Sequence, residues 1–359
     1  MQPFMKPIVI TGLLVSAITC IAQPLAIESL GTRVSDPIER AALLSRRAGT
    51  LILLGISRAG GRLVAVGERG TVVLSDDAGK SWRQAKQVPV AVSLTRVVFS
   101  APHVGWIVGH GGVVLKSEDG GETWIRQLEG RAAARLALQS VQEAAGRHDA
   151  RRAMEEAERL VVDGPDKPFL DLHFFDDKNG FVIGAYGIIF RTRDGGRSWQ
   201  PWMSRLDNPK GLHLNAIAQV GNALYIAGEK GLLLRSADGG EHFTVLKTPY
   251  TGSYFTVVAR KGRIVIGGLR GNAYESADEG KTWTALGVPT PVTLVGSAPL
   301  AGGELVYVNQ AGELLHGADG TLQRLPLPPL PPVTAVVQAS DGALVAASFR
   351  GPIRLPAVP

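Results

Sequence analysis

Cysteine is almost absent from this sequence, which has only Cys20, in an apolar stretch near the N-terminus. A single cysteine cannot form an internal disulfide, and a chain that loses its N-terminal segment would have no thiolate for catalysis or metal binding. The seven histidines are scattered singly and show no HExxH or comparable zinc spacing. We therefore expect no cofactor and no metal, and a fold that is stabilised by its hydrophobic core alone.

An excess of one charge is also lacking. The 38 basic and 32 acidic residues give a net charge of +6, spread along 359 residues, and no zinc-finger, recognition-helix or RNA-binding pattern accompanies them. The many glycines occupy turns without opening a helix after a strand, so they do not form a phosphate-binding loop. These features argue against a nucleic-acid partner, while 45% hydrophobic residues are enough for a large core.

The N-terminal segment has the pattern of a secretory signal peptide. Lys6 precedes a run of about 15 apolar residues at 7–22, which is short against the roughly 20 that a membrane span needs. Small residues at Cys20 and Ala22 favour cleavage before Gln23, whereas the residues before Cys20 do not match a lipoprotein site. We expect a signal peptide at 1–22 and a periplasmic protein; a retained membrane anchor is the alternative.

A short motif recurs along the chain, with Asp and Gly at its centre and, in the clear copies, an aromatic residue at its end. Its copies begin about 40 to 44 residues apart, except for one interval of 75 that would be regular without an insertion of about 33 residues. Five clear copies and a degenerate sixth are SDDAGKSW from Ser75, SEDGGETW from Ser117, TRDGGRSW from Thr192, SADGGEHF from Ser236, SADEGKTW from Ser276 and GADGTLQR from Gly317. A period of this size is typical of β-propeller blades and solenoid repeats.

Each clear copy of the motif lies in a unit with four β-rich runs. In the second unit these runs are 94–100, 105–109, 112–116 and 123–128. The chain contains seven such units, at about 50–88, 93–130, 168–204, 212–248, 252–287, 291–326 and 331–356. We therefore predict an all-β fold, a seven-bladed β-propeller over residues 36–356 with four-stranded blades. The last unit shows only three strands, and we expect residues 36–49 to supply the fourth and close the ring.

The repeated motif is best explained as a folding device. Its Asp and Gly residues permit a tight turn between the third and fourth strands, beneath which a tryptophan can pack. The tryptophans in these positions are Trp82, Trp124, Trp199 and Trp283. Trp202 lies outside the motif, so we expect its removal to destabilise the fold less than the removal of Trp124.

Residues 130–167 differ in composition from the repeats, being rich in Ala, Arg, Glu and Leu, and predict helix. Gly146 divides the segment, Asp149 can begin a second helix, and Gly164 with Pro165 ends it, so we predict a helical hairpin between the second and third blades. Its apolar stripe comprises Leu136, Leu138, Val141, Met154, Leu160 and Val161. This stripe either packs within the hairpin and against the propeller, or it forms a partner-binding arm.

Alignment of the units shows a basic column in the turn between the second and third strands. Equivalent turns of a propeller lie on one face, which would bring together Arg69, Lys230, Arg270 and Arg350, with His110 and Tyr186 beside them. A second column, directly before the motif, contains Lys116, Arg191, Arg235 and His316. Like charges gathered on one face call for an acidic partner or lipid headgroups, so we predict that the Lys and Arg residues of both columns bind a partner. The alternative is that these are ordinary solvated turns.

The five Asp-box turns, with strand pairs such as GWIVGHGGVVLKSEDGGETW at 105–124, resemble the photosystem II stability and assembly factor family and, more widely, the BNR repeats of sialidases. The resemblance covers roughly residues 48–356 apart from the insertion, which departs from the photosynthetic pattern. It implies a seven-bladed propeller that holds an immature membrane subunit through a basic patch. For non-photosynthetic bacteria it implies an exported protein whose gene often accompanies a transporter of the resistance-nodulation-division (RND) type.

The resemblance and the basic columns together predict a non-catalytic propeller. We expect a monomer that serves as a binding, assembly or accessory factor for a membrane-protein complex, with peripheral membrane contact. The alternative is a sialidase-like glycoside hydrolase or a carbohydrate-binding propeller. A sialidase needs three arginines around the substrate carboxylate, a Tyr–Glu nucleophile couple and an acidic proton donor. The sequence has no FRIP-like motif before the first Asp-box, and its nearest phrase, at 348–352, lies at the wrong end of the chain.

The N-terminal pattern makes a direct prediction about processing. Mass spectrometry of the exported protein should find a chain that begins at Gln23, because the apolar run ends in small residues that a signal peptidase accepts. An intact N-terminus in the membrane fraction would show instead that this segment is retained as an anchor.

Overall fold

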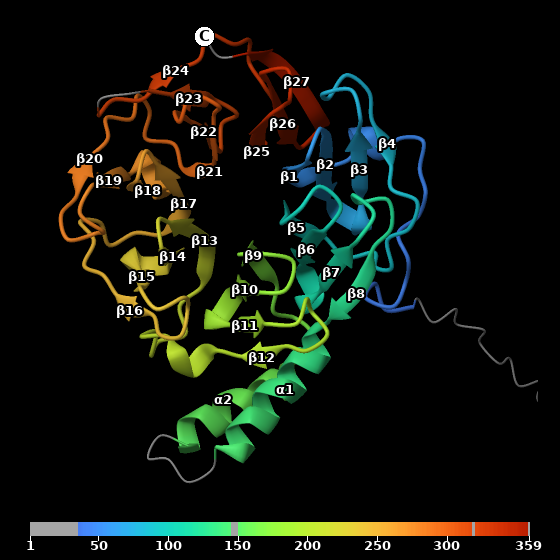
Figure 1. Cartoon of the computed structure of the whole chain (residues 1–359), viewed down its shortest axis with the longest axis vertical. Coiled ribbons are helices and arrows are strands. Elements are labelled where there is room, and N and C mark those ends of the chain that lie inside the picture. Colours follow the sequence, from blue (N-terminus) through green and yellow to red (C-terminus); the bar gives the residue numbers. More distant parts are fainter. Residues whose placement is uncertain (1–34, 145–149, 318–319, 358–359) are drawn as a thin grey trace, which may run out of the picture. The chain divides into compact units, whose positions relative to one another are not determined.

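The computed structural model describes residues 35–144, 150–317 and 320–357. From Asp36 onward these residues form seven antiparallel sheets, which follow one another in chain order around a central axis (Figure 1). The prediction of a seven-bladed β-propeller is confirmed. The predicted signal peptide at 1–22, with Cys20 and the cleavage site before Gln23, lies outside the described residues. Among the helices that the structure describes, none is long and apolar enough to cross a membrane.

The first four blades each contain four strands, which run from the central axis outward in chain order. Blade 1 consists of β1 (Leu53–Ala59), β2 (Arg62–Gly67), β3 (Val72–Ser75) and β4 (Arg83–Gln84). Blade 2 consists of β5 (Leu94–Phe99), β6 (Gly105–Gly109), β7 (Val114–Ser117) and β8 (Ile125–Leu128). Blade 3 consists of β9 (Phe169–Phe174), β10 (Gly180–Gly184), β11 (Ile189–Thr192) and β12 (Gln200–Pro201). Blade 4 consists of β13 (Leu214–Val220), β14 (Ala223–Gly228), β15 (Leu233–Ser236) and β16 (Thr244–Val245).

The remaining three blades complete the ring. Blade 5 consists of β17 (Tyr254–Arg260), β18 (Arg263–Gly268), β19 (Ala273–Ser276) and β20 (Thr284–Ala285). Blade 6 consists of β21 (Leu294–Pro299), β22 (Leu305–Asn309), β23 (Leu314–His316) and β24 (Gln323–Arg324). Blade 7 has three strands, which are β25 (Val333–Gln338), β26 (Ala343–Ser348) and β27 (Gly351–Ala357).

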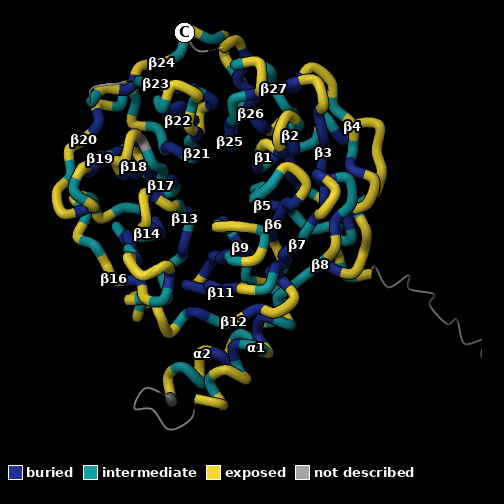
Figure 2. Tube along the Cα trace, viewed as in Figure 1, coloured by how far each residue is buried: buried dark blue, intermediate teal, exposed yellow. Residues whose placement is uncertain are grey.

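The hydrophobic core lies between neighbouring blades. A blade packs both of its faces against neighbours, so its second strand is apolar on both sides, as in β6, whose five residues are all buried. The buried clusters accordingly combine residues of adjacent blades, for example Leu74 of β3 with Val97 of β5. Figure 2 shows the result, with buried strands around the axis and exposed residues concentrated in the turns.

The ring closes through side-chain packing between blade 7 and blade 1. Leu53 of β1 shares a buried cluster with Val345 and Ala347 of β26. Across the same contact, the Thr334 hydroxyl of β25 donates a hydrogen bond to the Leu53 carbonyl at 2.9 Å. The first and last blades are thus joined by packed apolar side chains and a hydrogen bond, and neither blade contributes a strand to the sheet of the other.

Residues 36–49 do not supply a fourth strand to blade 7, so the expectation of closure by this segment is wrong. Its first part, residues 36–47, runs across the outside of blades 2 and 1 and is here called the N-terminal strap. Ile38 of the strap is buried in the space left by the missing side chain of Gly111, which favours this path over pairing with β27. The 3₁₀ turn η1 (Ala48–Thr50) then packs beside β27.

The Asp-box turn joins the third and fourth strands through hydrogen bonds to one carboxylate. In blade 1, Asp77 Oδ1 accepts hydrogen bonds from Ser75 Oγ at 2.8 Å and Ser81 N at 2.9 Å, and Oδ2 accepts from Ser81 Oγ at 2.6 Å. Asp119, Asp194, Asp238 and Asp278 are bound in the same way in blades 2 to 5. The hydrogen bond from Ser81 Oγ is the main cause that lowers the pKa of Asp77, and that from Thr282 Oγ1 is the main cause that lowers the pKa of Asp278 to about 2.

Trp202 is more deeply buried than its position outside the motif indicated. It precedes the 3₁₀ turn η5 (Met203–Arg205), its side chain is 7% exposed, and its indole Nε1 donates to Gly240 O of blade 4 at 2.6 Å. Trp124 is 1% exposed. The structure therefore removes the reason for expecting Trp202 to matter less than Trp124, because Trp202 fills the contact between blades 3 and 4.

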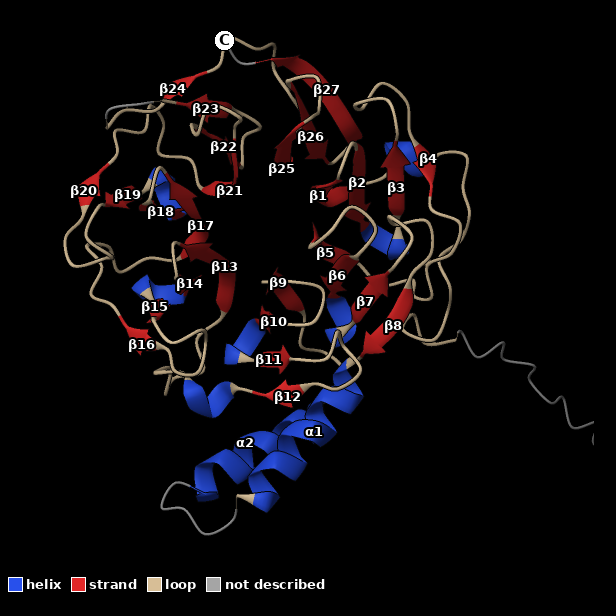
Figure 3. Cartoon of the chain, viewed as in Figure 1, coloured by secondary structure: helices blue, strands red, loops and turns tan. Residues whose placement is uncertain are grey.

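The insertion forms a pair of helices beside blade 3, outside the ring (Figure 3): α1 (Gly130–Glu143) and α2 (Ala150–Asp163). Glu129 caps α1, since its carboxylate accepts hydrogen bonds from the backbone amides of Arg131 and Ala132, both at 2.8 Å. The predicted division at Gly146 and the predicted start at Asp149 lie outside the described residues.

Part of the apolar surface of this hairpin is used inside the molecule. Ala137 of α1 and Ala157 of α2 are buried, and Leu136 and Leu160 pack against the core that blades 2 and 3 share. This arrangement favours the packing alternative, although Val161 is 42% exposed. The remaining residues of the stripe are half-buried, namely Leu138, Val141 and Met154.

The burial of the tryptophans predicts the cost of removing them. Trp124→Ala and Trp202→Ala should each lower the free energy of unfolding by about 3–5 kcal/mol, because each deletes a buried indole. Trp283→Ala should cost less, since the Trp283 ring is only half-buried. Urea denaturation measures all three, and a Trp202→Ala variant no less stable than Trp283→Ala would contradict the packing between blades 3 and 4.

The lowered pKa of the Asp-box carboxylates predicts acid destabilisation. A carboxylate whose folded pKa lies below its unfolded value of about 3.9 stabilises the fold fully above that value, and this contribution is lost as the pH falls towards the folded pKa. For Asp278, with a folded pKa of about 2, the loss occurs between about pH 4 and pH 2. The melting temperatures of the wild type and Asp278→Asn should therefore differ at neutral pH and converge in acid. A constant difference across this range would rule out a stabilising role for the charged carboxylate.

Candidate docking face

The turns between the second and third strands lie together at one end of the propeller. In each of the seven blades the first amide of this turn donates a hydrogen bond to the carbonyl of the residue before the innermost strand, at 2.8–3.2 Å. The donor and acceptor residues are Glu68–Ile52, His110–Ser93, Ala185–Pro168, Glu229–His213, Leu269–Ser253, Gln310–Thr293 and Phe349–Pro332. We call this end of the molecule the turn face, and the opposite end, which carries the Asp-box turns, the Asp-box face.

Five of these turns share one 3₁₀ geometry: η2 (Glu68–Gly70), η3 (His110–Gly112), η4 (Ala185–Gly187), η6 (Glu229–Gly231) and η7 (Leu269–Gly271). The middle residue of each adopts a left-handed backbone conformation, which favours glycine. Blade 2 has Gly111 there, with a φ of 71°. The other four blades have Arg69, Tyr186, Lys230 and Arg270, with φ between 51° and 58°. The turn geometry therefore does not explain these large side chains.

The basic residues of the turn column are exposed to solvent. Arg69, Lys230, Arg270 and Arg350 are all exposed, and within the described part of the chain none of the four is in an ion pair. The neighbouring Glu229 is engaged by His213, whose Nδ1 lies 3.1 Å from its carboxylate. The turn face thus presents four positive charges that the described protein residues do not pair.

The second predicted column lies at the other end of the third strands and is engaged within the propeller. Its ion pairs are Lys116–Glu118 at 2.7 Å, Arg191–Glu241 at 2.7 Å and Arg235–Glu279 at 2.6 Å. Arg191 is only 8% exposed, and both Arg191 and Arg235 reach a carboxylate of the following blade. Arg191 and Arg235 therefore bridge neighbouring blades, whereas Lys116 pairs within blade 2. Partner binding by Lys116, Arg191 or Arg235 stays a prediction that this geometry does not favour. His316, the remaining member, is half-buried.

Tyr186 forms an ordered aromatic site on the turn face. Its side chain is 59% exposed, and its ring centroid lies 4.8 Å from that of His213 and 5.0 Å from Lys167 Nζ. Lys167 is itself fixed by ion pairs with Asp163 at 2.9 Å and Asp166 at 2.5 Å. Sequence reasoning placed Tyr186 in the turn column but missed His213 and Lys167, because they lie in connections between blades that no motif marks.

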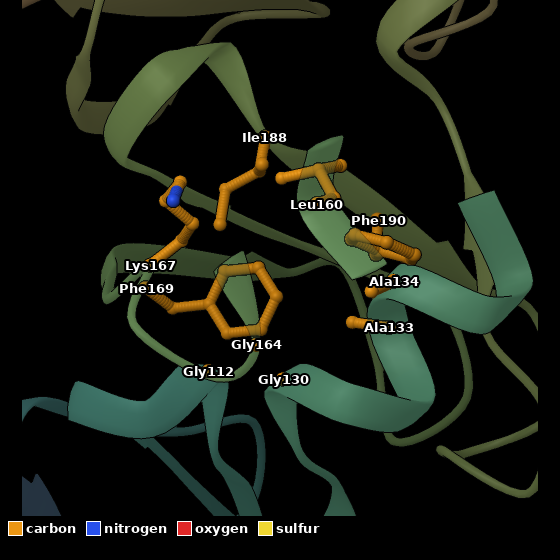
Figure 4. A pocket seen from close by; sticks show the side chains of 10 residues that line it. All are labelled: Gly112, Gly130, Ala133, Ala134, Leu160, Gly164, Lys167, Phe169, Ile188 and Phe190. Carbon is orange, nitrogen blue, oxygen red and sulfur yellow. The ribbon is translucent and has the colours of Figure 1, made fainter. Parts of the chain in front are cut away.

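A small pocket lies next to this site, between the hairpin and blade 3 (Figure 4). Its walls are mainly apolar, with Leu160, Phe169 and Phe190 among them, and Lys167 is the one ionisable residue of the lining. The Lys167 ammonium already binds two carboxylates. Such a lining suits packing and offers no pair of groups for acid–base or nucleophilic chemistry.

A sialidase-like site would require three arginines around an open position for a carboxylate. Arg191, Arg193 and Arg205 do gather, but they surround the Trp202 ring, with guanidinium carbons at 5.0, 5.5 and 5.2 Å from its centroid. Two of them also pair with Glu241. This cluster fills the contact between blades 3 and 4. Among the residues that the structure describes, no group of three or more His, Cys, Asp or Glu side chains is placed to hold a metal ion.

Comparison with known proteins identifies the family of the repeats. A family model described as photosynthesis system II assembly factor YCF48 matches residues 45–118 and 152–352. The match spans most of the propeller and leaves out 119–151, which contains α1.

Curated relatives match shorter stretches of the sequence. The chain is 33% identical over 119 residues to the photosystem II assembly lipoprotein Ycf48 of Synechococcus sp. (strain CC9902), which covers 32% of this chain and 36% of that protein. It is 31% identical over 117 residues to the chloroplastic photosystem II stability/assembly factor HCF136 of Arabidopsis thaliana, which covers 31% of this chain and 28% of that protein. The chain thus matches about a third of the length of these relatives.

Solved structures share the propeller over nearly its whole length. One described as YCF48 bound to D1 peptide has a TM-score of 0.61 at 17% identity, covering 89% of this chain and 97% of that chain. A streptogramin B lyase has a TM-score of 0.65 at 13% identity, covering 89% of this chain and 99% of that chain. At these identities the likeness shows the fold alone. The family match over more than half of the sequence shows that the chain belongs to the photosynthesis system II assembly factor YCF48 family.

Proposed function

We propose that this protein is a non-catalytic docking factor that binds an acidic, extended segment of a membrane-protein complex on its turn face. The observation that carries the proposal is the set of exposed basic residues at equivalent turns, Arg69, Lys230, Arg270 and Arg350. Three of these four have the left-handed backbone conformation that favours glycine. Like charges held together at a cost in backbone energy are accounted for by an acidic ligand that they attract.

The distribution of the four residues indicates the kind of ligand. They belong to blades 1, 4, 5 and 7, so one ligand must cross the face to reach most of them. A small anion cannot do so, whereas an extended acidic segment can contact several turns in succession. Exposed charges of this kind act mainly on the rate and specificity with which two molecules associate.

The relatives support an assembly role. The curated relatives are named photosystem II assembly factors, and one solved relative is described as bound to a D1 peptide. The first helix of the insertion, α1, lies in a part of the chain that the family model does not match. We infer from this difference that the partner of the present protein is a complex other than a photosystem.

The proposed location rests on the N-terminal pattern, and the proposed partner complex rests on the family resemblance. We propose that the protein is exported to the periplasm, with residues 1–22 as its signal, and acts there as a monomer. An RND-type transporter is the partner complex that the resemblance favours. A catalytic role has no comparable support, since the gathered arginines are engaged with Trp202 and Glu241 and the likeness to a lyase concerns the fold alone.

Charge reversal on the turn face tests this proposal. Replacing Arg69, Lys230, Arg270 and Arg350 together by Glu should weaken capture of the partner from detergent-solubilised membranes by about tenfold or more, because attraction becomes repulsion. The dependence of binding on salt should also be reduced. The fold should be retained, since exposed substitutions usually change stability by about 0.5 kcal/mol or less.

The matched control reverses two exposed arginines of the hairpin. Arg151 and Arg152 lie on α2, with side chains 94% and 65% exposed, and Arg151→Glu/Arg152→Glu should bind like the wild type. Unchanged affinity and unchanged salt response in the turn-face variant would refute the proposal. A loss seen only in the control variant would assign docking to the helical hairpin.

A further inference from the structure

Large apolar side chains share the turn face with the basic column, and an acidic peptide does not account for them. Tyr186 is 59% exposed, Phe349 47% and Leu269 37%. All three lie in the turns between the second and third strands. They belong to blades 3, 5 and 7, so this end of the ring carries exposed apolar side chains in three separate blades.

Two of these turns place an apolar residue directly beside a cation. Leu269 precedes Arg270, and Phe349 precedes Arg350. This pairing is typical of surfaces that lie on bilayers, where the apolar group enters the boundary of the acyl chains and the cation remains at the level of the lipid phosphates. Each basic residue near an anionic leaflet adds to the attraction.

The N-terminal strap brings further apolar residues to the edge of the turn face. Ala42 lies against η2, where a Cβ on Gly70 would be 2.9 Å from the Ala42 methyl group. The next two residues, Leu43 and Leu44, are 80% and 71% exposed. Exposed apolar residues are therefore also present at the periphery of blade 1.

The propeller also begins at this face. Asp36 pairs with Arg131 at the start of α1, and Ile38 packs on Gly111 of the turn η3. The first described residues of the propeller therefore lie at the turn face.

We propose that the turn face lies on an anionic lipid bilayer. Tyr186, Leu269 and Phe349 enter the headgroup region, while the basic residues of the turn column contact lipid phosphates. This proposal goes beyond the docking of a protein segment, because the ligand is the lipid surface itself. The bilayer and the segment use the same four cations, so they cannot occupy the turn face together. A flat surface can meet turns around the whole ring, whereas an extended peptide meets only those along its path. The Asp-box face, with its five carboxylates, is the opposite end and lies away from the bilayer.

A fluorescent label at a single cysteine reports which face meets the lipid. In the full chain with Cys20→Ser, Leu269→Cys places an environment-sensitive label on the turn face and Lys281→Cys places it on the Asp-box face of the same blade. Vesicles that contain phosphatidylglycerol should shift the emission of the label at 269 to shorter wavelength and leave the label at 281 unchanged. Vesicles of phosphatidylcholine alone should shift neither label. A shift at 281, or a shift at neither position with the anionic vesicles, would overturn the proposal.

A second variant tests whether Tyr186, Leu269 and Phe349, here called the apolar tips, make the contact. In the background Tyr186→Gly/Phe349→Ser, the fraction of the label at 269 that shifts should fall by about tenfold, because two apolar groups no longer enter the lipid. Glycine suits the left-handed backbone of residue 186, so the fold is preserved. The matched control Ile125→Ser/Val245→Ser removes exposed apolar residues, 65% and 51% exposed, from the outermost strands and should leave the shift unchanged. An equal shift in the variant and the wild type would overturn the proposal.

The experiments can distinguish failure of the lipid proposal from failure of the partner-docking proposal. The variant Tyr186→Gly/Phe349→Ser should still capture the protein partner from solubilised membranes, since all four cations remain. Loss of partner capture in this variant, with no shift of the label in the wild type, would assign the apolar tips to the protein partner and overturn the lipid proposal alone. A lipid shift of the label in the wild-type background, together with unchanged partner capture after charge reversal, would instead refute only the docking of an acidic segment.

Discussion

In each of the seven blades a backbone amide at the start of the turn between the second and third strands donates to the carbonyl before the innermost strand. The antiparallel strand order puts all these turns at one end of the ring, and the hydrogen bond ties each turn to the innermost strand of its blade. In blades 1 to 5 the same turn holds its middle residue in the left-handed conformation. The side chains at this position are exposed in Arg69, Tyr186, Lys230 and Arg270. Three of the four cations and Tyr186 on the turn face therefore depend on one repeated backbone constraint.

The number of blades could be predicted from the sequence because the Asp-box turn is built from neighbouring residues. Asp77 binds Ser75 and Ser81, so all the residues that form the turn lie within one copy of the motif and can be recognised there. The path of the N-terminal strap could not be predicted, since it depends on the fit of Ile38 against Gly111, far away in the sequence. The hairpin was recognisable from composition, whereas the packing of its apolar stripe depends on the surface that blades 2 and 3 provide.

The candidate site could be predicted only in part, because a repeat shows which residues are equivalent and does not show what they contact. Aligned repeats share a face, which is why the turn column could be found without coordinates. Whether a basic residue is free or paired depends on the neighbouring blade, as the ion pair between Arg191 and Glu241 shows. The two columns therefore look alike in sequence and differ in the structure. Lys167 and His213, which order Tyr186, become visible only when the connections between blades are placed in space.

Both proposals place docking on the turn face. Hydrogen–deuterium exchange, measured for the protein alone and with vesicles prepared from the membranes of its source organism, reports on both faces at once. We expect slower exchange in peptides that contain the turns 68–70, 185–187, 229–231, 269–271 and 349–351, with the Asp-box turns unchanged. Slower exchange confined to the Asp-box turns or to α2, with the turn face unchanged, would contradict it.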